Sequence, residues 1–364
     1  MTADEAVTAS SGWVRDWHPA WMGVVLGTGG AAVAGLVDPL PFTRIDEVIG
    51  ALLAALAVVL LPILLVPYVQ RQRHHPDAAA ADLAHPGLGA LFGTVPASLL
   101  IVGLALAQLA VIGWLPTGTA WVSAALLAVG LVGAVAVGVA FFSGIVAREQ
   151  VPAEAMTGAW FIPIVVLVLV PSVVARLVLL EPTWRVSSAA VLAAASVGAG
   201  LMLFLLLAPV IAWRLITSPT PPAQQAATWW IWLAPAGAGG LGVLAASRLA
   251  AATFGGVASD VLPVVGLLGA TAIWGFGAWW SVFAGRVLVT TSRRGGGLPF
   301  HLGSWGFAFP TAAMTALTVE LGRSWSAPVV SVLGAVGFVA TLLVWVVLAT
   351  QTVAATRAGR VFAR

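Results

Sequence analysis

Ten long apolar stretches follow one another along this chain of 364 residues, and almost none of them carries a charge between its ends. A helix needs about 20 mostly apolar residues to cross the hydrocarbon core of a bilayer. Lipid offers no hydrogen-bond partners, so each crossing segment must satisfy its own backbone groups, as an α-helix does. The pattern predicts an all-α integral membrane protein with ten transmembrane helices. We expect them at residues 19–37, 48–68, 88–111, 120–143, 157–175, 187–213, 229–247, 261–285, 302–321 and 328–352.

The connections between these stretches are short, and none has the composition of a soluble domain. Charged residues make up 8% of the chain, against about 25% in soluble domains. We therefore predict one membrane domain at 19–352, with short tails at 1–18 and 353–364. The chain contains no cysteine, which excludes thiol nucleophiles and thiolate metal sites.

Arginine supplies all 16 basic residues, and its placement predicts the orientation of the chain. Eleven arginines lie in the two tails and in the connections after even-numbered stretches, whereas the other connections hold five. Cytoplasmic loops carry the excess of basic residues, so we expect both termini in the cytoplasm of a multi-pass protein of the cell membrane. No basic face alternates with aromatic residues, and we expect no nucleic-acid partner.

Proline and glycine lie well inside the odd-numbered stretches, whereas in the even ones proline lies mostly near an end. Proline removes a backbone hydrogen bond and glycine permits close approach, so helices interrupted in this way often line cavities. For any one position, close packing of helices is the simpler explanation. Recurrence in five alternate stretches favours a pore lining, formed by Gly27, Thr28, Gly29, Gly30, Pro96, Pro163, Pro235 and Pro310.

Ionisable residues within a membrane usually mark ion or proton pathways, and here they are confined to loops and helix ends. Arg176, Arg248 and Glu320 lie near the outer ends of the fifth, seventh and ninth stretches. Since no carboxylate or imidazole lies near the middle of the bilayer, the sequence disfavours a pump or a tightly proton-coupled exchanger. It also shows no catalytic constellation of the kind membrane enzymes carry, so we expect no enzyme and no cofactor.

All five histidines fall on the predicted cytoplasmic side. The segment from His74 to His85 contains the ligand types of a zinc site without a recurring spacing, so we expect a solvated loop and no metal site. His18 and His85 each precede a proline that opens an odd-numbered stretch, where proline suits the first turn of a helix.

Four motifs in order resemble the tellurite-resistance/dicarboxylate transporter family, which includes SLAC1-type plant anion channels, bacterial TehA and fungal malate and sulfite transporters. The resemblance covers essentially the whole chain. The motifs are His18-Pro19-Ala20-Trp21-Met22 running into Gly27-Thr28-Gly29-Gly30, then Asp82-Leu83-Ala84-His85-Pro86, Trp160-Phe161-Ile162-Pro163, and Pro299-Phe300-His301-Leu302 followed by Trp305-Gly306-Phe307-Ala308-Phe309-Pro310.

This resemblance implies five helical hairpins around a central pore, with the odd helices inside, commonly assembled as a homotrimer. It also implies that Phe309, the phenylalanine of the Phe-Pro pair, closes the pore, with Trp305 in the same motif. The implied function is transport of small anions such as chloride, nitrate, sulfite or a C4-dicarboxylate like malate. Two alternatives stay open: a proton-coupled dicarboxylate or sulfite exporter, and, less favoured, a membrane enzyme or signalling subunit.

Overall fold

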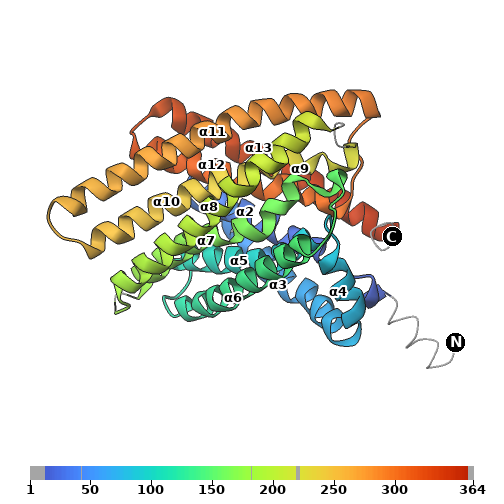
Figure 1. Ribbon diagram of the computed structural model, residues 1–364. Helices are drawn as coiled ribbons and strands as arrows, with labels where there is room; N and C mark the ends of the chain where they lie inside the picture. The colour runs from blue at the N-terminus through green and yellow to red at the C-terminus, as the bar shows by residue number, and fades with distance from the viewer. Residues whose placement is uncertain (1–12, 42, 182, 219–221, 360–364) are drawn as a thin grey trace.

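The computed structural model describes residues 13–41, 43–181, 183–218 and 222–359, and within them the chain is helical without strands. The long helices run roughly side by side across the molecule (Figure 1). The α-helices are α2 (Met22–Leu36), α3 (Ile45–His74), α4 (Pro76–Ala84), α5 (Thr94–Val111), α6 (Thr119–Val146), α7 (Ile162–Leu180), α8 (Val186–Thr217), α9 (Ala227–Trp230), α10 (Leu233–Thr253), α11 (Val257–Gly295), α12 (Ala308–Ser324) and α13 (Pro328–Arg357). Short 3-10 helices are η1 (Pro19–Trp21), η2 (Gly89–Gly93), η3 (Ala153–Ala155), η4 (Gly158–Phe161), η5 (Ala223–Gln225) and η6 (Leu302–Phe307).

Nine helical segments of the described chain are long and apolar enough to cross a bilayer, and each coincides with a predicted stretch. The remaining stretch, 302–321, consists of η6 and α12. Helix α12 is less apolar because it carries Glu320, Arg323 and several threonines, which it can do because most of its residues are buried among other helices and do not face lipid. The all-α membrane fold is confirmed, while ten crossings remain a prediction.

Five helices form a closed inner ring, in which α2 contacts α5, α5 contacts α7, α7 contacts α10, α10 contacts α12, and α12 contacts α2. Each inner helix pairs with the helix that follows it in a hairpin, so α3, α6, α8, α11 and α13 form an outer layer. Each outer helix also contacts the next inner helix, and thus covers a seam of the ring. The fold therefore surrounds a central axis with the odd-numbered stretches.

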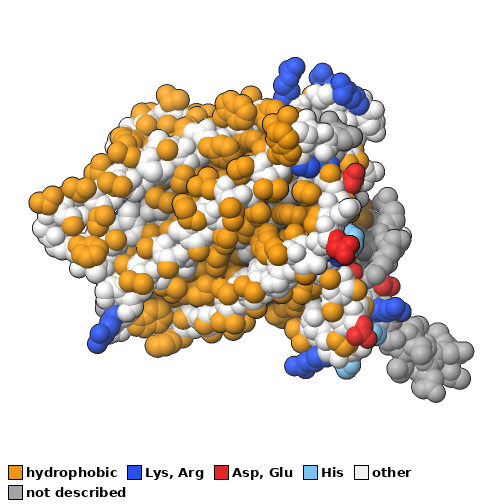
Figure 2. Space-filling view, in the orientation of Figure 1, with side chains coloured by type: hydrophobic (Ala, Val, Ile, Leu, Met, Phe, Trp, Pro, Cys, Tyr) orange, Lys and Arg blue, Asp and Glu red, His pale blue; other side chains and the backbone are white. Residues whose placement is uncertain are grey.

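Burial separates the two layers. We compared the most apolar part of each helix that could cross a bilayer. In the four inner helical segments of this kind, between 61% and 94% of these residues are buried, whereas in the outer helices the share is 17% to 33%. The exposed side chains of the outer helices are largely valine, leucine and other apolar residues, as expected for contact with lipid. Figure 2 shows this apolar surface, with most visible charges gathered at the end of the molecule where the C-terminus lies.

Four prolines of the inner helices do not interrupt them in the middle, contrary to our expectation, whereas Pro171 does lie inside α7. Pro96, Pro163, Pro235 and Pro310 are each the second or third residue of an α-helix that follows a short helical turn. The N–H groups of the first turn have no intrahelical partner, so proline costs no hydrogen bond there. The glycine cluster of the first stretch likewise lies within the continuous helix α2.

Small residues allow the inner helices to approach closely. A Cβ atom added to Gly237 of α10 would lie 2.5 Å from the backbone nitrogen of Met314 in α12. Tryptophan indoles add hydrogen bonds between helices, as when Trp345 donates to Thr28 and Trp274 donates to Thr318. Close packing and polar links of this kind hold membrane helices together, because lipid supplies little hydrophobic drive for their association.

Two segments near the ends of predicted stretches differ from expectation. The region from His74 to His85 is not a loop, because α4 occupies most of it, and Asp82 forms an ion pair of 2.5 Å with Arg71. Helix α13 continues to Arg357, into the predicted C-terminal tail. Residues 1–12 and 360–364 of the predicted tails lie outside the described part of the chain.

Candidate functional site

A large cavity of about 1260 Å³, here called the vestibule, opens at the end of the molecule where all five inner helices begin. Each inner span contributes a residue from its starting turn to the vestibule wall: Ala20, Leu91, Ala159, Thr228 and Leu302. The N-terminal ends of five helices thus converge on one space. The positive ends of their dipoles favour negative charge there, so the vestibule is electrostatically suited to collecting anions.

Histidine side chains cap two of these helix starts, and a third histidine binds the turn ahead of another. The Nδ1 atom of His18 accepts a hydrogen bond from the backbone N–H of Ala20, and Nδ1 of His301 accepts one from Gly303. His85 accepts from two backbone N–H groups ahead of η2, while Thr157 caps η4 with its hydroxyl. Each imidazole must lack a proton on Nδ1 to act in this way. Enclosure by the vestibule wall lowers the pKa of His301, although its contact with a backbone carbonyl opposes the change.

The vestibule wall also contains carboxylates, among them Asp82 and Glu154. Arg71 is fully buried beneath Asp82 and neutralises it. Within the described residues, no group of three or more histidine or acidic side chains is arranged to hold a metal ion.

A second, narrow cavity of about 60 Å³ continues from the vestibule into the ring. The two cavities share five wall residues, Ala20, Leu91, Ile231, Leu302 and Gly303. Among the described residues, the wall of the narrow cavity contains no ionisable side chain. A single water needs at least about 10–15 Å³ of such space, so the cavity has room for only a few waters.

Phe309 lies in the wall of the narrow cavity, and only 7% of its surface is exposed. Its ring approaches α2 so closely that a Cβ atom on Gly30 would lie 3.1 Å from Cδ2 of Phe309. Leu169 of α7 and Ala234 of α10 also line this cavity. A bulky aromatic residue is therefore enclosed between inner helices beside the narrow cavity.

Trp305 and Pro310 are the other predicted site residues that line the narrow cavity. The Trp305 indole nitrogen donates to Thr352 of α13, so the ring extends between α2 and α13. A Cβ atom on Gly27 would lie 2.6 Å from Cε3 of Trp305. Gly27 therefore provides the space that the Trp305 ring occupies.

The remaining predicted positions contact neighbouring helices. Gly29 faces Ile101 of α5, and the buried Thr28 accepts a hydrogen bond from Trp345 in the outer layer. Pro96 lies against two glycines of α6. Pro163 lies against Gly93 of η2, and Pro235 is buried in the first turn of α10.

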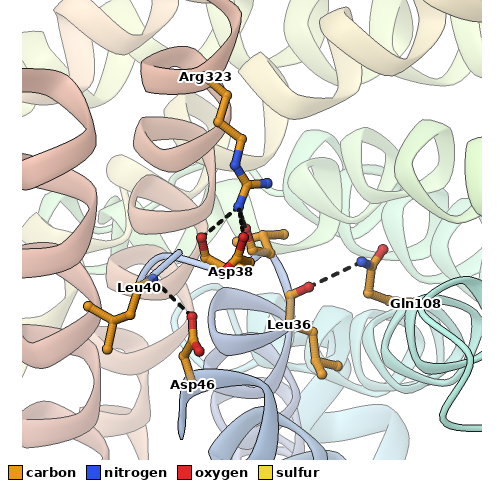
Figure 3. Close-up of polar contacts among 7 residues, drawn as sticks. Leu36, Asp38, Leu40, Asp46, Gln108 and Arg323 are labelled. Carbon is orange, nitrogen blue, oxygen red and sulfur yellow. Dashed lines mark hydrogen bonds and ion pairs between the residues drawn. The ribbon is translucent and has the colours of Figure 1, made fainter. Parts of the chain in front are cut away.

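Polar side chains link the inner helices at the end opposite the vestibule. Arg323 of α12 binds carbonyl groups at the end of α2 and forms an ion pair of 3.0 Å with Asp38, as Figure 3 shows. Gln108 of α5 donates to the carbonyl of Leu36 in α2 (Figure 3) and accepts from Arg176 of α7. Burial raises the pKa of Asp38, and the nearby Arg323 limits this rise.

Sequence reasoning missed the role of Gln108, which joins three inner helices and is itself buried. A signal was present, since a lone amide in an apolar stretch needs partners in a membrane. Arg248 and Glu320 add a further link, an ion pair of 2.6 Å between α10 and α12.

A ring of apolar helices around a wide vestibule and an adjoining narrow cavity is typical of multi-pass membrane transport proteins. The family model described as "SLAC1: Voltage-dependent anion channel" matches residues 16–353. The chain therefore belongs to this family.

Similar proteins cover almost the whole chain. A sulfite efflux pump SSU1 of Trichophyton rubrum is 26% identical over 363 residues, which are 96% of this chain and 94% of that protein. An uncharacterized transporter of Methanocaldococcus jannaschii is 27% identical over 366 residues, which are 98% of this chain and 99% of that protein. A sulfite efflux pump of Arthroderma benhamiae is 26% identical over 363 residues, with 96% and 94% covered.

Proposed function

We propose that this protein transports small anions such as chloride, nitrate, sulfite or malate passively through the inner ring, with Phe309 as the gate. The observation that carries the proposal is the position of Phe309 in the wall of the narrow cavity, between inner helices. In this proposal the ring blocks water and ions, and the small cavity beside it has room for only a few waters. Rotation of the ring, or a small shift of α12, would open the path.

The vestibule and the narrow cavity have different roles in the proposed transport. Helix N-termini at the vestibule attract anions, whereas the apolar wall around Phe309 binds them weakly. Weak binding suits conduction, because an ion must leave a site as readily as it enters. In this proposal Trp305 and Pro310 hold the starting turn of α12 in place beside the gate.

Anion flux into proteoliposomes tests the gate. We expect Phe309→Ala to raise chloride and nitrate flux several-fold at a fixed membrane voltage, because truncation removes the ring from the path. The matched control is Phe307→Ala, since Phe307 is two residues away but contacts Trp230 and does not line the narrow cavity. Equal flux in wild type, Phe309→Ala and Phe307→Ala, at matched incorporation, would refute the gate.

Sulfite is the specific substrate that the comparisons favour, because several relatives are sulfite efflux pumps. A proton-coupled exporter would need titratable groups on its path. The described wall of the narrow cavity has none, so coupling would have to use groups at the two ends of the pore. Sulfite flux that persists after the proton gradient is collapsed supports passive transport, and flux that stops supports the exporter.

We further propose that the protein lies in the cell membrane with both termini in the cytoplasm, assembles as a homotrimer, and is not an enzyme. The arginine distribution supports the orientation, and the family resemblance supports the trimer. Membership in a family of channels and transporters supports the absence of catalysis. Protease accessibility of tagged termini in sealed vesicles tests the orientation, and mass measurement in detergent tests the trimer.

A further inference from the structure

One seam of the inner ring lacks a polar link at the end opposite the vestibule. Side-chain bonds connect α7 to α5, α5 to α2, α2 to α12, and α12 to α10. Among the described residues, no side-chain hydrogen bond or ion pair joins α7 to α10 at this end. Arg176 and Arg248 lie on these two helices instead, within electrostatic range of each other. The two helices of this seam therefore carry like charges that repel each other, whereas the other seams carry attractive contacts.

The guanidinium of Arg176 faces the interior of the ring. It donates through Nε to Gln108 of α5, and it lies within electrostatic range of Glu320 on α12. Helices α7 and α12 are not neighbours in the ring. A group on α7 that interacts with both α5 and α12 must therefore point towards the central axis. The two Nη groups of Arg176 form no hydrogen bond with another described residue, which leaves several donors available.

Glu320 compensates only part of this charge. Its carboxylate forms an ion pair with Arg248, and the same arginine reaches the hydroxyl of Ser324. Two guanidinium groups and one carboxylate leave one net positive charge in this group of residues. Guanidinium presents its donors in a planar fork that fits the oxygens of carboxylates and other oxyanions.

We propose that Arg176 and Arg248 form a binding site for small oxyanions, such as nitrate or sulfite, at the mouth of the pore opposite the vestibule. The carboxylate of Glu320, which is part of the chain, competes with the anion for the guanidinium of Arg248. An anion between the two arginines would relieve their repulsion and would accept from the free Nη groups of Arg176. The role of this site in transport rests on the proposed function, but its occupancy can be measured without transport.

The test is nitrate titration of the purified full-length protein, followed by thermal unfolding at constant ionic strength. A ligand that binds the folded state raises the unfolding temperature with its concentration, which gives an apparent affinity. We expect Arg176→Gln to weaken nitrate binding at least about tenfold, because charge-assisted hydrogen bonds to the anion are lost. Glu320→Gln should strengthen binding, because it removes the competing carboxylate.

Arg185→Gln is the matched control. Arg185 is an exposed arginine at the start of the outer helix α8, at the same end of the molecule, so its removal changes charge equally without touching the ring. If Arg176→Gln does not fold, tighter nitrate binding by Glu320→Gln supports the site. The same affinity in wild type, Glu320→Gln and Arg185→Gln, or no nitrate effect on wild type, would overturn it. Intact nitrate binding with no flux through Phe309→Ala would instead refute the transport proposal and leave the site standing.

Discussion

Gly237 is a position at which an added methyl group should force two inner helices apart. In Gly237→Ala the new Cβ atom would lie 2.5 Å from the backbone nitrogen of Met314, whereas ordinary contacts are 3.4 Å or longer. The carbonyl carbon of Ala313 lies nearer still, so helices α10 and α12 would have to separate by at least about 0.9 Å, the difference between 3.4 Å and 2.5 Å. The obstructing atoms belong to the backbone of α12, so no flexible side chain can move aside.

We expect Gly237→Ala to lower the free energy of unfolding by about 3 kcal/mol, the upper part of the range for overpacked cores. Thermal unfolding in detergent measures this effect as a fall in the midpoint temperature. The control is Gly198→Ala in α8, where an added Cβ atom meets nothing within 4 Å. Alanine favours a helix by up to about 1 kcal/mol over glycine, so this control should be as stable as wild type or more so. A Gly237→Ala protein with the wild-type midpoint would refute the close approach of α10 and α12.

Two further outcomes follow from contacts at the ends and in the middle of the ring. Trp345→Phe should lower the free energy of unfolding by about 1 kcal/mol, because the fully buried Thr28 hydroxyl loses its indole donor. The double variant with Thr28→Val should lose less unfolding free energy than the two single variants together. Acidification should destabilise the wild type, because only the neutral His301 imidazole can accept the capping hydrogen bond and its pKa is lowered by burial. The stabilisation is complete above about pH 6.5, the ordinary histidine pKa, and is lost as pH falls through the lower pKa of the folded state. His301→Asn keeps a cap that does not titrate, so its unfolding midpoint between pH 8 and pH 5 should fall less than that of wild type; equal slopes would contradict the cap.

The sequence supports the membrane fold because its evidence is local. A stretch of about 20 apolar residues forms a helix in lipid whatever its neighbours are, since no other conformation satisfies its backbone. Proline and glycine inside the odd-numbered stretches also predicted that these stretches form the inner layer, and the burial of the helices confirms it. The reason for that contrast differs from the expected one, because Pro96, Pro163, Pro235 and Pro310 start helices and do not break them.

The candidate site was harder to derive from single residues. Phe309 and Trp305 were named from a motif that resembles a known family, whereas Gln108 and its partners required the folded chain. Gly27 and Gly30 illustrate the difference well. Their small size was visible in the sequence, but the rings of Trp305 and Phe309 that fill the space beside them became apparent only in three dimensions.

The sequence by itself therefore determined the helices, their approximate ends and the inner position of the odd-numbered stretches. Only the tertiary structure decided which side chains line the narrow cavity, and that Arg176 and Arg248 lie on neighbouring helices of the ring. The physical reason is that lipid and protein interior are both apolar. A helix surrounded by either one shows little hydrophobic periodicity, so the faces of the helices are assigned by packing and by contacts between residues far apart in the chain.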